Sequence, residues 1–164
     1  MFRRISVQCD DFDVATEIAV LRENDSRVGA IAVFIGTVRE MNDGGNDPEN
    51  ASLPVQTMTL EHYPGMTEKA LTKIADEAAH RFDIFGVTVI HRIGELKPLD
   101  QIVLVAVKSA HRGDAFDACR FIMDYLKTQA PFWKKETTGK GAHWVDARGS
   151  DEEAAARWQL PGNG

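Results

Sequence analysis

The sequence predicts an α+β protein in which helices pack against a β-sheet. Runs rich in β-branched residues alternate with longer segments in which apolar residues recur at helical spacing. Between residues 55 and 130 these segments follow the order strand, helix, strand, strand, helix. The chain has 164 residues, 43% of them hydrophobic, which is enough for one domain with a buried core. We therefore expect a single domain over residues 1–164.

The N-terminal part of the chain is expected to hold two strands, a helix and a loop. Ile5 and Val7 alternate with polar neighbours, which indicates a short strand. Residues 11–24 begin with acidic side chains and carry apolar residues at helical spacing, so they predict a helix. The run GAIAVFIGTVRE at 29–40 is typical of a largely buried strand. Residues 41–54 are rich in Gly, Asn, Asp and Pro and predict a flexible loop.

The middle of the chain predicts a two-layer sandwich. Its five expected elements are a strand at 55–63, a helix at 67–82, strands at 86–94 and 101–110, and a helix at 114–130. A turn at 97–100 joins the last two strands. Helices and strands in this order favour two helices that cover one face of the sheet.

The C-terminal part is expected to be less regular. Pro131 has no amide hydrogen, so it ends the preceding helix, and a fresh helical turn can begin there. Residues 143–148 predict a last strand. The residues from Ser150 to Glu153 have the form of a capping box and predict a short helix that ends near Trp158. Residues 159–164 are expected to be disordered.

Composition argues against several classes of protein. A net charge of −6 disfavours a nucleic-acid partner held by bulk charge. The five histidines show no metal-ligand spacing, so no metal or other cofactor is expected. Cys9 and Cys119 form no CxxC motif, and both are expected to be buried and inert in a reducing compartment. Because neither a secretory signal nor a membrane-spanning run occurs, we expect a cytoplasmic protein.

Basic residues gather around YLKTQAPFWKKE, residues 125–136. Lys127 has two interpretations that stay open: a cation that favours a helix C-terminus, or part of an anion pocket. Phe132 and Trp133 are expected to anchor this segment in the core, with Lys134 beside them. Arg39 and the pair His111-Arg112 follow predicted strands, where functional groups are often presented. The second such pair, His91-Arg92, is interpreted as structural.

Five blocks of sequence carry a resemblance to a known family: FIGTVRE, LEHYPGMTEKAL, VIHRIGEL, SAHR and FIMDYLKTQAPFWKKE. From about residue 29 to residue 158 the chain resembles the large, catalytic subunits of molybdopterin synthase. The resemblance implies an α/β hammerhead-like fold with an added β-α-β-β-α subdomain. It also implies a sulfurtransferase of molybdenum cofactor biosynthesis, which converts a cyclic pyranopterin monophosphate (precursor Z) into molybdopterin.

The resemblance further implies partners and site residues. Sulfur is expected from the C-terminal Gly-Gly thiocarboxylate of a small ubiquitin-like carrier subunit, and two large subunits are expected to form a homodimer at the centre of a heterotetramer. Lys127 and Lys134 are the implied catalytic residues, without any cofactor. The implied substrate-binding residues are Thr37, Val38, Arg39, His111, Arg112, Lys127, Lys134, Lys135, Glu136 and Arg148.

Two other functions remain open at this point. The chain could dock the carrier without catalysis, with its lysines as contacts for the carrier tail. An RNA-binding module is the other alternative, because sheets of this kind can bind single-stranded RNA. The acidic charge and the missing aromatic strand signature count against RNA binding.

Overall fold

The structure is a computed structural model that describes residues 1–40, 54–145 and 149–159. Its elements, in chain order, are β1 (Phe2–Gln8), α1 (Val14–Arg22), β2 (Ala30–Thr37), β3 (Thr57–His62), α2 (Met66–Arg81), β4 (Ile84–Arg92), β5 (Gly94–Leu96), β6 (Gln101–Ser109), α3 (Arg112–Gln129), β7 (Phe132–Thr138), β8 (Gly141–Val145) and α4 (Gly149–Ala156). The predicted α+β class is confirmed. The loop predicted at 41–54 and the tail predicted at 159–164 lie almost wholly outside the described residues.

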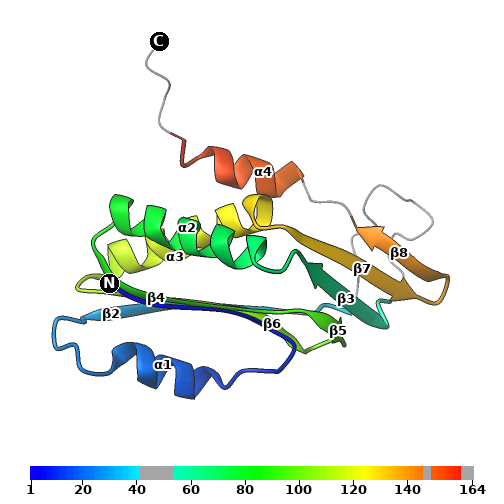
Figure 1. The fold of residues 1–164 in the computed structure, drawn as a ribbon, viewed down its shortest axis with the longest axis horizontal. Helices are drawn as coiled ribbons and strands as arrows, with labels where there is room; N and C mark the ends of the chain where they lie inside the picture. Colours follow the sequence, from blue (N-terminus) through cyan, green and yellow to red (C-terminus); the bar gives the residue numbers. More distant parts are fainter. Residues whose placement is uncertain (41–53, 146–148, 160–164) are drawn as a thin grey trace, which may run out of the picture.

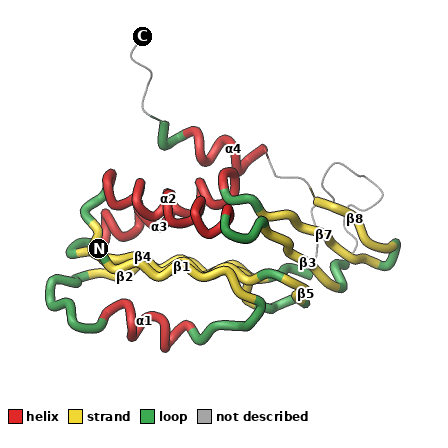
Figure 2. The backbone as a smooth tube through the Cα atoms, in the orientation of Figure 1, coloured by secondary structure: helices red, strands yellow, loops and turns green. Residues whose placement is uncertain are grey.

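The larger of two sheets has the strand order β1-β4-β6-β2. Strands β1 and β4 are parallel, and the other neighbours are antiparallel. Helices α2 and α3 cover one face of this sheet and α1 lies on the other, as Figures 1 and 2 show. The two helices predicted between residues 67 and 130 therefore cover one face of a sheet, as expected, and the helix predicted at 11–24 covers the other face. The central strands β4 and β6 are buried on both faces, which explains their nearly continuous apolar sequences.

The main core lies between this sheet and the α2–α3 layer. Val87, Val89 and Val105 of the sheet are fully buried there, together with Leu71 of α2 and Phe121 of α3. The apolar stripes predicted for these two helices supply this contact. A ring cluster extends it to the C-terminal segment, where Trp158 meets Phe121 edge to face at 5.6 Å between ring centroids. In the described part of the chain, no helix is both long and apolar enough to cross a membrane.

A second sheet, with the order β5-β3-β7-β8, lies beside the end of the first. Strand β3 pairs with β5 and β7, so the strand–helix–strand–strand–helix region does not form one sheet of its own. The helical turn predicted after Pro131 was also wrong, because this segment is strand β7. Thr67 Oγ1 of α2 donates to the Pro131 carbonyl oxygen at 3.0 Å, and the chain then pairs with β3.

Strand β2 is less buried than predicted. It lies at the edge of the larger sheet, and Val33, Phe34 and Ile35 are 42%, 40% and 39% exposed. Three consecutive exposed apolar residues leave both faces of this strand accessible. An exposed apolar edge strand of this kind is a common site for association with another chain.

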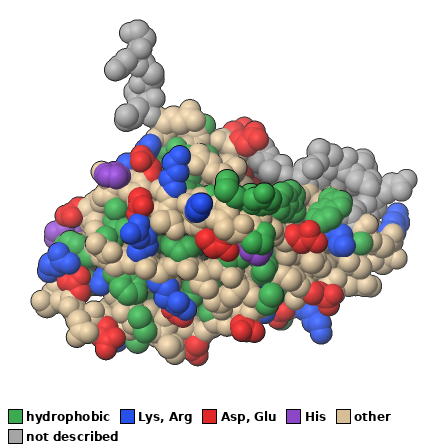
Figure 3. Space-filling view, in the orientation of Figure 1, with side chains coloured by type: hydrophobic (Ala, Val, Ile, Leu, Met, Phe, Trp, Pro, Cys, Tyr) green, Lys and Arg blue, Asp and Glu red, His purple; other side chains and the backbone are tan. Residues whose placement is uncertain are grey.

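Two further side chains differ from the predictions. Trp133 is 48% exposed rather than in the core, because it alternates with the inward-facing Phe132 and Lys134 along β7. Cys9 is exposed at the end of β1, whereas Cys119 is buried as predicted. On the face drawn in Figure 3, Lys and Arg side chains are interspersed with Asp and Glu, so this face carries no extended basic patch.

Candidate functional site

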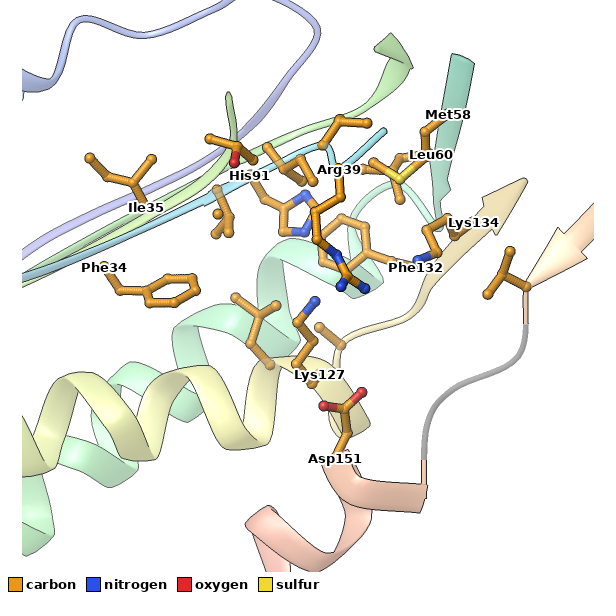
Figure 4. A pocket seen from close by; sticks show the side chains of 18 of the residues that line it. Phe34, Ile35, Arg39, Met58, Leu60, His91, Lys127, Phe132, Lys134 and Asp151 are labelled. Carbon is orange, nitrogen blue, oxygen red and sulfur yellow. The ribbon is translucent and has the colours of Figure 1, made fainter. Parts of the chain in front are cut away.

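A pocket of about 570 Å³ opens where the end of β2, the C-terminal end of α3 and strand β7 meet (Figure 4). Three cationic side chains, Arg39, Lys127 and Lys134, line it, and in Figure 4 they point into the same cavity. Its other lining residues are Phe34, Ile35, Gly36, Thr37, Val38, Met58, Leu60, His91, Ile102, Val103, Leu126, Ala130, Phe132, Glu136, Val145 and Asp151.

Arg39 is placed by hydrogen bonds of the residue before it. The Val38 amide donates to the Asp100 carbonyl oxygen at 3.0 Å, and the Val38 carbonyl accepts from the Leu99 amide at 2.9 Å. Val38 itself is buried. These two hydrogen bonds attach the chain after β2 to the turn between β5 and β6. Arg39 follows directly, so its backbone is held at the rim of the pocket.

Lys127 lies in the last turn of α3, where a cation interacts favourably with the helix dipole. The helix ends at Gln129, and Ala130 has extended backbone angles of φ −83° and ψ 129°. Ala130 and Pro131 connect the helix to β7, which begins at Phe132. Lys127 and Lys134 therefore meet across a helix–strand corner and do not share one helix face.

Lys134 lies on the inner face of β7, opposite Leu60 of β3. Its ammonium is 3.4 Å from a carboxylate oxygen of Glu136, two residues along the same strand. Glu136 is only 7% exposed, and it faces Met58 across the sheet. This pairing holds the Lys134 charge at the pocket wall, although Lys134 is not fully buried.

Two ionisable residues of the pocket, His91 and Asp151, were not identified from the sequence as part of a site. His91 was interpreted as structural, but it lines the pocket and its ring stacks on Phe132 at 3.8 Å between centroids. Burial lowers the pKa of His91 to about 4, with smaller contributions from Lys127 and His62. Asp151 comes from the first turn of α4. The position of His91 beside a strand end was the only available signal.

Four predicted site residues are not among the lining residues of this pocket. His111 and Arg112 are exposed at the start of α3, and fifteen residues of helix put Arg112 about 22 Å from Lys127. Lys135 points to the opposite face of β7, where its ammonium lies 5.5 Å from the Trp144 ring centroid. Arg148 lies outside the described residues.

The pocket combines charge with apolar walls. Its cations can bind phosphate or carboxylate oxygens through charge-assisted hydrogen bonds, and Arg39 can do so with two parallel bonds. Phe34, Phe132 and Leu60 provide surfaces for a planar ring. Among the described residues, no cluster of three or more His, Cys, Asp or Glu side chains could hold a metal ion. The geometry therefore suits a small anionic molecule with a ring system.

Comparisons with known sequences give a consistent result. The sequence pattern of the MoaE protein family matches residues 7–129. A protein of Ralstonia nicotianae named "Molybdopterin synthase catalytic subunit" is 60% identical over 156 residues, which cover 95% of this chain and 84% of that protein.

Solved structures show the same fold. The MoaE protein of Burkholderia ambifaria MC40-6, titled as a molybdopterin biosynthesis protein, is 53% identical with a TM-score of 0.80. That match covers 98% of this chain and all of the other. A more distant chain, from a complex of subunits 1 and 2 of the molybdopterin-converting factor of Helicobacter pylori 26695, is 17% identical with a TM-score of 0.66. It covers 89% of this chain and 91% of that chain, and supports the fold alone.

Proposed function

The chain belongs to the MoaE protein family, and on that premise we propose that it is the catalytic subunit of a molybdopterin synthase in molybdopterin biosynthesis. Relatives that carry this name match nearly the whole chain. The single observation that supports the activity is the meeting of Arg39, Lys127 and Lys134 in one pocket. These residues come from three separate parts of the chain: the end of β2, the last turn of α3 and strand β7. Lysine and arginine side chains that were only solvated surface charges would have no reason to point into one cavity.

The proposed reaction transfers sulfur to precursor Z from a thiocarboxylate on a small carrier subunit. Both reactants are anions, because the precursor carries a cyclic phosphate and the donor is a thiocarboxylate. Cations in a partly enclosed pocket can bring two such groups together and stabilise the charge that develops as they react. In each transfer the thiocarboxylate sulfur forms a C–S bond to the precursor while a C–O bond of the precursor breaks, and water then cleaves the acyl C–S bond, which leaves the sulfur on the pterin side chain and a carboxylate on the carrier. Two carriers therefore supply the two sulfurs of the dithiolene.

Each charged pocket residue is proposed to have a separate role in the reaction. Lys127 acts as acid/base or nucleophile, because a lysine amine can exchange protons or attack an acyl group. Lys134 stabilises negative charge and is held for this by Glu136. Arg39 anchors the phosphate through its planar guanidinium. The apolar wall formed by Phe132 and Leu60 takes the pterin ring.

A second copy of the chain is proposed to complete the pocket. His111 and Arg112 are too far along α3 to act in the pocket of their own chain, yet the family resemblance makes them substrate ligands. The exposed apolar edge of β2 offers a surface for a second copy, and Phe34 and Ile35 of that edge also line the pocket. Dimerisation would therefore bury apolar surface next to the site.

Turnover of precursor Z tests the catalytic role. Purified protein, thiocarboxylated carrier and precursor Z are expected to give the dithiolene product, whereas a subunit that only docks the carrier would give none. Lys127→Arg keeps the positive charge but loses the titratable amine, so it should bind precursor and lose about 10²- to 10⁴-fold in kcat. The matched control is Lys69→Arg, on the exposed surface of α2. Near-normal turnover by Lys127→Arg would remove Lys127 from the chemistry.

Mixing two inactive variants tests the shared pocket. Lys127→Ala and His111→Ala are each expected to be inactive as pure dimers. In a mixed dimer, one pocket receives both an intact Lys127 and an intact His111, so random re-assortment should restore about one quarter of wild-type activity. If His111 acts in its own chain or has no role in the pocket, the mixture will show no more activity than the two separate variants.

A further inference from the structure

His91 and Asp151 are titratable side chains of the pocket that the proposed function leaves without a role, and His91 is the more deeply placed of the two, on the central strand β4. His91 is 6% exposed and belongs to the pocket wall together with Arg39 and Lys127 (Figure 4). Its ring is nearly parallel to the Phe132 ring, with an interplanar angle of 18°. Stacking and burial fix the orientation of this ring more firmly than a surface histidine would be fixed.

The backbone selects the tautomer of the ring. His91 Nδ1 lies 2.8 Å from the carbonyl oxygen of Arg92. Because a carbonyl oxygen can only accept a hydrogen bond, Nδ1 must carry the hydrogen. Burial disfavours the charged ring, so His91 is neutral at pH 7 and its Nε2 is a hydrogen-bond acceptor.

A neutral hydrogen-bond acceptor can fix the position of a lysine amine without stabilising its charged form strongly. Lys127 lies near enough to His91 for its charge to disfavour protonation of the ring. A lysine ammonium has three N–H donors on a flexible stem, and an acceptor at a fixed point restricts its position. A carboxylate at the same point would also restrict it, but would stabilise the charged ammonium much more strongly and oppose proton release.

We propose that His91 is a positioning residue for Lys127, in which Nε2 accepts a hydrogen bond from the Lys127 amine and directs it into the pocket. This role rests on the proposed function, because it concerns the amine assigned to acid/base or nucleophilic work. The ring stays neutral and exchanges no proton itself. Its contribution is to hold the reacting nitrogen in place while the carrier tail and the precursor meet.

Two variants separate positioning from packing. His91→Phe keeps an aromatic ring to stack on Phe132 but removes both nitrogens. His91→Gln loses the ring but can place an amide oxygen near the position of Nε2. For turnover of precursor Z with thiocarboxylated carrier, His91→Phe is expected to lower kcat by about 10- to 100-fold with KM for the precursor nearly unchanged. His91→Gln is expected to recover most of this loss.

The outcomes distinguish the alternatives. Wild-type kcat in His91→Phe, or equal losses in both variants, would overturn the positioning role. Nitrogen-15 NMR of the wild-type ring at pH 7 gives a test that needs no variant to fold: the expected form is neutral with hydrogen on Nδ1, and a ring protonated on Nε2 overturns the inference. If wild-type protein forms no product while the NMR result is as expected, the proposed function fails instead.

Discussion

The pair formed by Lys134 and Glu136 gives the most direct test of how the pocket is held together. The two charges are 3.4 Å apart, which corresponds to a gross attraction of about 5 kcal/mol at an effective dielectric constant near 20. Desolvation offsets most of that attraction. Exposed pairs contribute about 0–1 kcal/mol, and breaking a buried pair costs about 3–5 kcal/mol. With side chains 32% and 9% exposed, this pair lies between these limits, and we expect a coupling of about 1–2 kcal/mol.

A double-mutant cycle with Glu136→Gln and Lys134→Met measures this coupling by urea unfolding at pH 7. Lys134→Met should cost more stability than Glu136→Gln, because it removes a cation 3.4 Å from the more deeply buried of the two charged groups. Glu136→Gln should lower Tm by about 2–8 °C for a chain of this size. A coupling below about 0.3 kcal/mol, or the opposite order of the two single variants, would show that Glu136 does not hold Lys134 through their charges.

Three further predictions follow from burial and close packing. As pH falls from 6.5 towards 4, the unfolded chain should take up a proton at residue 91 that the folded chain does not. Stability should therefore fall by up to about 3 kcal/mol, and this dependence should be flatter in His91→Phe, as measured by urea unfolding across that range. Iodoacetamide at pH 8 should alkylate exposed Cys9 and spare Cys119, whose pKa burial raises to about 11; mass spectrometry showing equal labelling would contradict this. Gly86→Ala should destabilise by about 1–3 kcal/mol, because its Cβ would lie 2.6 Å from Cε of the buried Lys108, and unchanged stability in urea would show that Lys108 can move aside.

Local patterns in the sequence were enough to predict most of the elements. The β-branched runs of β4 and β6 and the apolar stripes of α2 and α3 each lie within one short window, and tertiary packing preserved them. The α+β class follows from the order of these windows. The basic residues gathered at 125–136 were also visible, because proximity in sequence needs no fold. The roles assigned to Arg39, Lys127 and Lys134 remain predictions that turnover experiments must test.

Only the tertiary structure decided which strands pair and which side chains meet. The segment after Pro131 became β7 because β3, some seventy residues earlier, offered a pairing edge, and no local propensity encodes a distant partner. That pairing turned Trp133 and Lys135 outward, placed Lys134 in the same pocket as Lys127, and placed Phe132 against His91. The sequence by itself therefore determined which side chains are available for a site. The corner between α3 and β7 determined which of them share a cavity, because the change in chain direction there sets which side chains face one another, and residue spacing along the sequence does not contain that information.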